Sequence, residues 1–397
     1  MPFARGAVIP PVTGSTSNEG VADLRCFFAR YTHARIADAP MRQIENGRRQ
    51  RMSVPGCKWP NKQLGSFLFS ARRQTQAAAW SGSVLLALAC GVMPAGPLLA
   101  AEEEVGRANV AVLYPDIGEP YRGVFGAIIA GVEDRVDRAR GKVSGIAIPM
   151  GGNPPAMSDE LRKRDVKAVI TLGRSGLKAA ANLDKQFTVV AGGVLSVPEA
   201  EAQGMLVQSL APEPALLFAK LKAFAPFVKR VVVVHDPRQN DWLIHLAREA
   251  AKAQSLELLA LGADDLKGAV RLYQDQLGSL HPKRDALWLP QDTTTVEEST
   301  VLPMVLRESW RQNLVVFSSN VTHVRRGVLF SLYPDNIEIG RFLAGAALAP
   351  LQPGGQATRG IQALKQVLTA ANTRTAEHLG LDLGASQQRI HLVFPER

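Results

Sequence analysis

Short apolar runs alternate with amphipathic segments along residues 109–341, and most apolar runs end in polar residues. The clearest run is 231–234 (VVVV), which is followed directly by His235 and Asp236. Continuous apolar runs of this length are typical of strands that are buried on both faces of a parallel sheet. The sequence therefore predicts an α/β fold built from repeats of strand, polar loop and helix.

The repeats predict two lobes of the same kind, because the pattern restarts near residues 210–214. Strands are expected at 109–114, 143–149, 168–172, 187–191, 231–234, 256–261, 285–290, 314–317 and 327–332. The main helices are expected at 120–138, 177–183, 242–254, 264–280 and 296–311. We therefore predict two doubly wound, Rossmann-like lobes at 102–210 and 211–332. A closing helix, a strand and a C-terminal segment at 333–397 are expected to pack back across both lobes.

The net charge of +10 is unevenly distributed, since residues 1–101 carry +8 of it and the rest of the chain only +2. A main body this close to neutrality, and a prefix without basic clusters between aromatic residues, do not favour nucleic-acid binding. The prefix also holds all three cysteines, Cys26, Cys57 and Cys90. The main body can therefore form neither a disulfide nor a thiolate metal site.

Residues 62–101 have the pattern of a secretory signal peptide. Basic Arg72 and Arg73 precede the apolar run 84–90, and small residues at 98–101 precede three glutamates. We therefore expect a periplasmic protein. Because a signal peptide should begin the chain, we infer that the assigned start is too early and that residues 1–61 are a mis-translated or disordered prefix.

Several alternatives stay open for this prefix. The apolar run could be a retained membrane anchor, although it is short for a bilayer. Residues 87–90 resemble a lipoprotein acylation site, which would anchor the protein at Cys90. Arg72 and Arg73 are compatible with twin-arginine export, and residues 1–60 with a basic arm.

In parallel α/β sheets, ligands bind beyond the carboxyl ends of the strands, so the candidate site residues are the polar ones that follow predicted strands. In the second lobe these are Asp236, Asn240, Gln291, Asp292, Thr293, Ser318 and Ser319. Asp292 is followed by three threonines, which is more than a helix cap needs. The alternative is that Asp236 and Asp292 only cap the helices that follow them.

In the first lobe, Asp116 and Glu119 are expected to bind a ligand amine or hydroxyl, or else to favour a helix start through the helix dipole. Arg174 and Ser175 lie at a predicted turn from strand to helix, where main-chain amides and a guanidinium can bind an anion. The alternative is an N-cap serine beside a solvated arginine.

No catalytic or cofactor motif accompanies these loops. The sequence lacks a His-Glu-x-x-His motif, a Gly-x-Ser-x-Gly motif and a phosphate loop, and no Gly-x-Gly-x-x-Gly follows the first strand. His235 and Asp236 are adjacent, and neighbours at a strand end usually point apart, which does not favour an acid–base pair. We therefore expect a binding protein that uses no metal and no cofactor.

A resemblance supports this expectation. Residues 285–295 (DALWLPQDTTT), 314–319, 326–330, 337–341 and 371–381 resemble the second half of the extracytoplasmic substrate-binding proteins of ABC transporters. They are more narrowly similar to an uncharacterised-transport-system family that includes proposed tryptophan or tyrosine binders. The resemblance spans about residues 107–384 and is looser in the first half.

The resemblance implies a type I periplasmic-binding-protein fold, in which a hinge joins two lobes that close on a small molecule. It also implies a membrane permease as partner and adds Tyr121 and Gly193 to the cleft residues. At 192–195 (GGVL) the sequence departs from the Asp-Pro that family members commonly have, which leaves the ligand open.

The expected function is that of a monomeric, non-enzymatic protein that binds a small polar metabolite, with amino acids among the candidates. The alternatives are a periplasmic ligand-sensing component without transport, a two-lobed α/β transferase, and a transcriptional regulator with a related effector domain.

Overall fold

The computed structural model describes residues 108–118, 121–148, 154–195, 197, 202, 204–384 and 389–395, and all of them belong to one compact unit of the chain. The predicted signal peptide, the three cysteines and Glu119 lie outside the described residues. For Tyr121 only the backbone is described. None of the described helices has the length and apolar character needed to cross a membrane.

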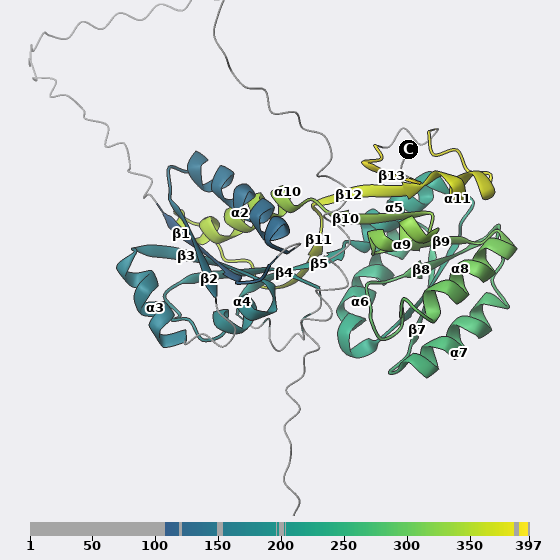
Figure 1. The fold of residues 1–397 in the computed structure, drawn as a ribbon, viewed down its shortest axis with the longest axis horizontal. Coiled ribbons are helices and arrows are strands. Elements are labelled where there is room, and N and C mark those ends of the chain that lie inside the picture. The colour runs from purple at the N-terminus through teal and green to yellow at the C-terminus, as the bar shows by residue number, and fades with distance from the viewer. Residues whose placement is uncertain are drawn as a thin grey trace, which may run out of the picture. The chain divides into compact units, whose positions relative to one another are not determined.

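The first lobe is built on a six-stranded sheet in which every neighbouring pair is parallel. Its order is β11 (Gly360–Leu364), β5 (Leu206–Pro212), β4 (Thr188–Val194), β3 (Val166–Leu172), β1 (Asn109–Pro115) and β2 (Val143–Ile148). Helices α2 (Tyr121–Arg138) and α10 (Asn336–Leu348) cover one face of this sheet. Helices α3 (Pro154–Lys163) and α4 (Gly173–Ala180) cover the other face (Figure 1).

The second lobe is built on a seven-stranded sheet. Its order is β13 (Leu392–Phe394), β12 (Val367–Asn372), β10 (Phe330–Pro334), β9 (Val315–Ser318), β8 (Asp285–Leu289), β6 (Arg230–His235) and β7 (Glu257–Gly262). Strands β6 to β10 are parallel, and β12 runs antiparallel to β10. Helices α5 (Pro214–Phe224) and α6 (Pro237–Ala253) cover one face, and α7 (Leu266–Leu277) and α8 (Val301–Gln312) cover the other. Two short helices, α9 (Val321–Arg326) and α11 (Thr373–His378), lie in the connections after β9 and β12, and a 3₁₀ turn, η3 (Ala349–Leu351), follows α10.

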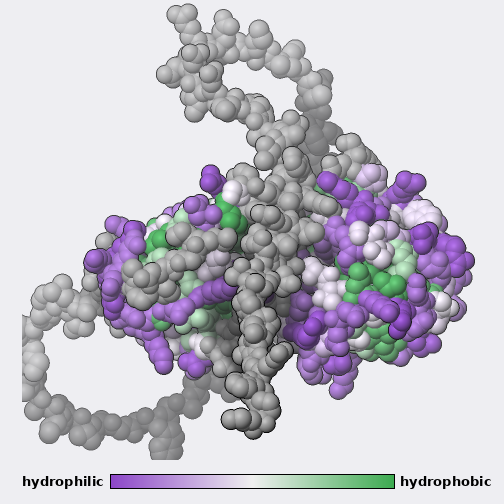
Figure 2. Space-filling model, turned by 60° about the horizontal axis from the view of Figure 1, so that its bottom comes forward, coloured by the Kyte–Doolittle hydropathy of each residue, from purple (hydrophilic) through white to green (hydrophobic). Residues whose placement is uncertain are grey.

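Both sheets have the apolar character that the sequence predicts. All four valines of 231–234 are fully buried, and the largest buried side chains of the second lobe, such as Trp288 and Phe317, belong to its parallel strands or pack on them. On the outside, hydrophilic residues predominate on the face seen in Figure 2, with smaller hydrophobic areas among them. The predicted fold class of two doubly wound α/β lobes is confirmed.

The chain passes between the two sheets three times, from β5 to α5, from β10 to α10 and from β11 to β12. Main-chain hydrogen bonds join the crossings to one another. The Glu213 amide donates to the Leu364 carbonyl at 2.8 Å, and the Asp335 amide donates to the Gln366 carbonyl at 2.9 Å. A small number of adjacent crossing segments is the arrangement expected of a hinge.

Some element boundaries differ from the prediction. Helix α8 begins at Val301 and not at 296, because the side chains of Asp292 and Glu297 hold the preceding residues in turns. Helix α6 begins at Pro237, several residues before the predicted 242, because Asp236 caps it and proline suits its first position. Strand β5 and helix α9 were not predicted.

Candidate functional site

A pocket of about 170 Å³ lies beyond the carboxyl ends of β8 and β9. Leu195, which follows β4 of the first lobe, also lines it, so both lobes contribute to its wall. Its polar lining residues come from the second lobe and are Gln291, Asp292, Thr293, Glu297, Glu298, Asn320 and His323. This is the edge of a parallel sheet where ligands are expected to bind.

The carboxylate of Asp292 organises the loop after β8. One oxygen, Oδ1, accepts hydrogen bonds from the amides of Thr294 and Thr295 at 2.9 and 3.0 Å. The other, Oδ2, accepts from the Asp236 amide at 2.6 Å and from Asn240 Nδ2 at 2.9 Å. Asp292 is only 3% exposed, and these four N–H donors provide the hydrogen bonds that its buried oxygens need. The residue therefore shapes the pocket, and its contact with a ligand stays a prediction.

Asp236 has the helix-capping role that the sequence allowed for it. Its Oδ1 accepts from the Arg238 amide at 3.0 Å, and its carboxylate also accepts from the Arg238 guanidinium and from Thr294 Oγ1. Burial alone would raise the pKa of this carboxyl. The hydrogen bonds from Arg238 and Thr294 lower that pKa by more than burial raises it, so the pKa lies below its ordinary value. Asp236 is therefore an ionised link between the loops after β6 and β8.

Ser318 and Ser319 lie at the end of β9, and both side chains bond within the protein. Ser319 Oγ accepts from Trp288 Nε1 at 3.0 Å. Ser318 Oγ donates to the Leu289 carbonyl at 3.1 Å and accepts from the Asn320 amide at 2.9 Å. It also lies 2.8 Å from His323 Nδ1. Because the single serine proton is used by Leu289, Nδ1 of His323 is the donor to Ser318, which leaves Nε2 as an acceptor.

Asn320 and His323 also line the pocket. Asn320 is the last residue of the polar run that follows the strand predicted at 314–317, whereas the sequence did not single out His323. Burial, together with the nearby charge of Arg326, lowers the pKa of His323 to about 3, so the imidazole is neutral. Asn320 caps α9 by accepting from the Thr322 amide at 2.9 Å. The position of Asn320, a polar residue between a strand and a short helix, is the sequence feature that indicates a site residue here. His323 lies inside that unpredicted helix.

Gln291 carries an unused acceptor. Its Oε1 atom is buried and finds no hydrogen-bond partner among the described residues. Buried side-chain oxygens without a partner are rare, so a donor from a bound molecule is a natural partner for this one. The lining also contains the carboxylates of Asp292, Glu297 and Glu298, whereas no Lys or Arg belongs to the part of the lining that the structure describes.

In the first lobe, the predicted residues lie at the ends of three neighbouring strands, β1, β3 and β4. Asp116 is exposed after β1, and Arg174 and Ser175 are half-buried in the first turn of α4. Gly173 and Gly193 both have φ of +70°, and a Cβ on Gly193 would lie 3.4 Å from the Gly173 amide. The N-cap of α4 is Leu172, so Ser175 is not the N-cap that the alternative interpretation required.

The predicted residues thus form two groups. Asp236, Asn240 and Asp292 share one hydrogen-bond network, and Gln291, Thr293, Ser318 and Ser319 lie on the neighbouring strand ends. The residues of the first lobe form their own group. Leu195 is the first-lobe residue that lines the described pocket.

No family model matches the chain, and no curated protein matches it. Among solved structures, the ligand-free, open form of a substrate-binding protein with adhesive properties from Clostridium difficile has a TM-score of 0.53 and 15% identity, over 73% of this chain and 100% of that chain. A domain in complex with L-Trp from Streptococcus pneumonia matches with a TM-score of 0.45 and 14% identity, over 73% and 100% of the two chains.

A periplasmic ribose ABC transporter from Conexibacter woesei matches with a TM-score of 0.41 and 15% identity, over 69% of this chain and 94% of that chain. Regulators of the LacI family also match, at 12% identity. Identities this low concern the fold alone. With a TM-score of 0.53 over 100% of its length, the Clostridium difficile protein shares its fold with this chain, which has two α/β lobes joined by three crossings. The chain therefore has the type I periplasmic-binding-protein fold.

Proposed function

We propose that the protein is an extracytoplasmic solute-binding protein of an ABC-type transport system, and that it binds a small polar metabolite between its lobes. The observation that carries this proposal is the pocket at the ends of β8 and β9, to which Leu195 of the other lobe contributes. A ligand that contacts both lobes binds the closed arrangement more tightly than an open one and shifts the population towards it. The three crossings provide a hinge for that motion.

The chemistry of the lining favours a ligand with hydrogen-bond donors, such as an amino group. Gln291 offers a buried unpaired oxygen, His323 is neutral with an acceptor nitrogen, and Glu297 adds negative charge. Glu298 adds a further carboxylate, which is paired with Arg326 at 3.5 Å. In the first lobe, Arg174 and Ser175 in the first turn of α4 suit a carboxylate. An amino acid carries both groups, and Asp116, Glu119, Tyr121 and Gly193 complete the proposed site.

The same geometry supports a role without catalysis. Ser318 and His323 are the serine and histidine in hydrogen-bond contact at the site, but Ser318 is fully buried and donates its proton to the Leu289 carbonyl. A nucleophile must reach the substrate and transfer its proton to the base, and this serine does neither. We propose a periplasmic location and a permease of the inner membrane as the partner.

Isothermal titration calorimetry of the full chain tests the proposal, with the common amino acids and small amines as titrants. We expect saturable binding of one of them, weakened at least about tenfold by Gln291→Ala, because the donor of the ligand loses its buried acceptor. Gln274→Ala, at an exposed position of α7, is the matched control and should leave the affinity unchanged.

A folded sample that releases no heat with any titrant would contradict the proposal. So would binding that Gln291→Ala and Gln274→Ala leave equally strong. Transport is tested separately, by uptake of the bound ligand in cells that lack the protein. Unchanged uptake together with an intact affinity would favour the ligand-sensing alternative.

A further inference from the structure

A second and larger pocket, of about 470 Å³, lies in the second lobe at the opposite edge of the sheet. Leu314 and Val316 at the start of β9 line it, and so does Asn372 at the end of the antiparallel β12. The first pocket lies at the carboxyl ends of the parallel strands, so the two pockets are separated by the length of the strands. Its volume is within the range of small-molecule sites, roughly 300–1,000 Å³.

The charged side chains that line this pocket are arginines. Arg307, Arg325, Arg326 and Arg374 line it, and its described lining contains no Asp or Glu. Glu308 on the same helix is not part of the lining and accepts from Arg311 and Gln312. Arg326 is partly balanced by Glu298, at 3.5 Å. Clustered arginines are typical of sites for carboxylate or phosphate groups, because the guanidinium fork binds both of these anions through paired hydrogen bonds.

A flat aromatic surface forms one wall. The ring of Trp310 is stacked on the ring of His378, with centroids 3.6 Å apart and an angle of 5° between the planes. His378 Nε2 also donates to the Trp310 carbonyl at 2.9 Å, which fixes the imidazole in this position. Arg374 lies 6.0 Å from the Trp310 ring centroid, so a cation and an aromatic face are presented side by side.

The wall is also accessible. Trp310 is 41% exposed, so its ring can be reached by a bound molecule. Leu306, Leu314 and Leu379 supply further apolar surface next to it. The pocket thus combines an apolar, aromatic part with a strongly cationic part.

We propose that this pocket binds a small organic anion, in which a carboxylate or phosphate group is attached to an apolar ring. The ring packs against the Trp310–His378 pair, and Arg307 and Arg374 bind the anionic group. This site is distinct from the proposed interlobe site, because the two pockets share no lining residue.

Titration of the full chain with phenyl phosphate and with benzoate tests the proposal, by calorimetry and by quenching of the tryptophan fluorescence. Inorganic phosphate serves as the anion without a ring, and benzyl alcohol as the ring without a charge. We expect at least one of the two aromatic anions to bind at least tenfold more tightly than inorganic phosphate and benzyl alcohol. Binding should quench the fluorescence, and Trp310→Phe should remove the quenching.

Arg374→Gln and Arg307→Gln should each weaken this binding about tenfold. Arg311→Gln changes an exposed arginine of the same helix that is not part of the lining, and it should leave the affinity unchanged. Unaltered thermal unfolding of the variants shows that they fold. Equal affinity in all three variants, absence of binding of both aromatic anions, or equally tight binding of inorganic phosphate would overturn the proposal. Gln291→Ala should not change the affinity for the aromatic anion, which separates this site from the first.

Discussion

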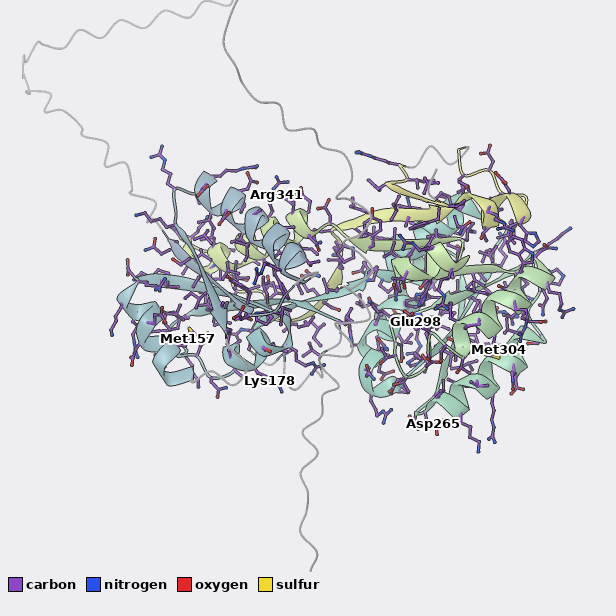
Figure 3. All side chains as sticks on the ribbon, viewed as in Figure 1. Met157, Lys178, Asp265, Glu298, Met304 and Arg341 are labelled. Carbon is purple, nitrogen blue, oxygen red and sulfur yellow. The ribbon has the colours of Figure 1, made fainter. Side chains whose placement is uncertain are left out.

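Gly131 of α2 and Gly340 of α10 lie where the backbones of these two helices touch. A Cβ on Gly340 would lie 2.0 Å from the Ile128 carbonyl oxygen, and one on Gly131 would lie 2.0 Å from the Ile337 carbonyl oxygen. Beside this contact, Arg341 of α10, labelled in Figure 3, donates to Asp134 of α2 at 2.6 Å. Helix α10 follows the second crossing between the lobes. The two glycines therefore let α10 pack closely against α2 of the first lobe.

Gly340→Ala should therefore destabilise the protein by about 3 kcal/mol, at the upper end of overpacking costs, because a backbone cannot move aside as a side chain can. Gly345→Ala on the same helix is the control, since its Cβ would meet only Arg135, at 3.8 Å. There the better helix propensity of alanine should leave stability unchanged or raise it by up to about 1 kcal/mol. Urea unfolding measures both, and equal stability of the two variants would contradict this account of the contact.

The fold was largely predictable because apolar runs report burial directly. Residues 231–234 and 285–289 read as buried strands, and both are fully buried. The lobe to which α10 and β11 belong was harder to infer, since it depends on the close approach of Gly131 and Gly340. A glycine in a helical pattern does not reveal which distant helix it faces. The start of α8 was mispredicted for a related reason, because side chains of the loop hold 292–300 in turns.

The positions of the site residues were predictable, but their contacts were not. Strand order brings Asp236, Asp292 and Ser318 to one sheet edge, as parallel strands require. The sequence cannot distinguish a polar side chain that faces a ligand from one that bonds its own loop. Asp292 and Ser318 bond their own loops, while His323 and Gln291 keep acceptors available.

The ion pair between Asp285 and Arg230 joins the starts of β8 and β6. Arg230 Nε and Nη2 donate to the two oxygens of Asp285 at 3.0 and 2.6 Å, and the Asp285 side chain is fully buried. Asp285→Ala should cost at least about 3 kcal/mol, because it leaves a largely buried guanidinium without its partner. Glu257→Ala breaks an exposed pair with Arg284 and should cost less than about 1 kcal/mol. Chemical denaturation compares the two, and similar costs would count against the importance of the buried pair.

Asp292→Ala should affect stability and ligand binding together. It removes the acceptor from the amides of Asp236 and Thr295 and from Asn240, all of which are buried, and should cost about 3 kcal/mol. Thr293 lines the same pocket but is exposed, so Thr293→Ala should leave stability unchanged and lower the affinity alone. Unfolding and calorimetry on both variants separate the roles. If Asp292→Ala keeps full stability, its carboxylate does not hold the loop.

His323 should make the protein less stable in mild acid. Its pKa is lowered to about 3 in the folded protein by burial and by Arg326, whereas an unfolded histidine titrates near its ordinary value of 6.5. Between these values the unfolded chain binds one more proton, so stability is fully present above about pH 6.5 and falls as the pH decreases. His323 alone should contribute a loss of about 2 kcal/mol between pH 7 and pH 5. His235, whose pKa burial also lowers, adds to the loss in the same direction.

Denaturation of His323→Asn at pH 7 and pH 5 measures this contribution. The variant should lose about 2 kcal/mol less than the parent protein over that interval, because asparagine does not titrate. His245→Asn changes an exposed histidine of α6 and should follow the parent protein at both pH values. Carboxylates such as Asp236 and Asp285, whose pKa values are lowered, destabilise the fold only at more acidic pH. An identical pH dependence in parent and His323→Asn would mean that folding does not lower the pKa of the His323 imidazole.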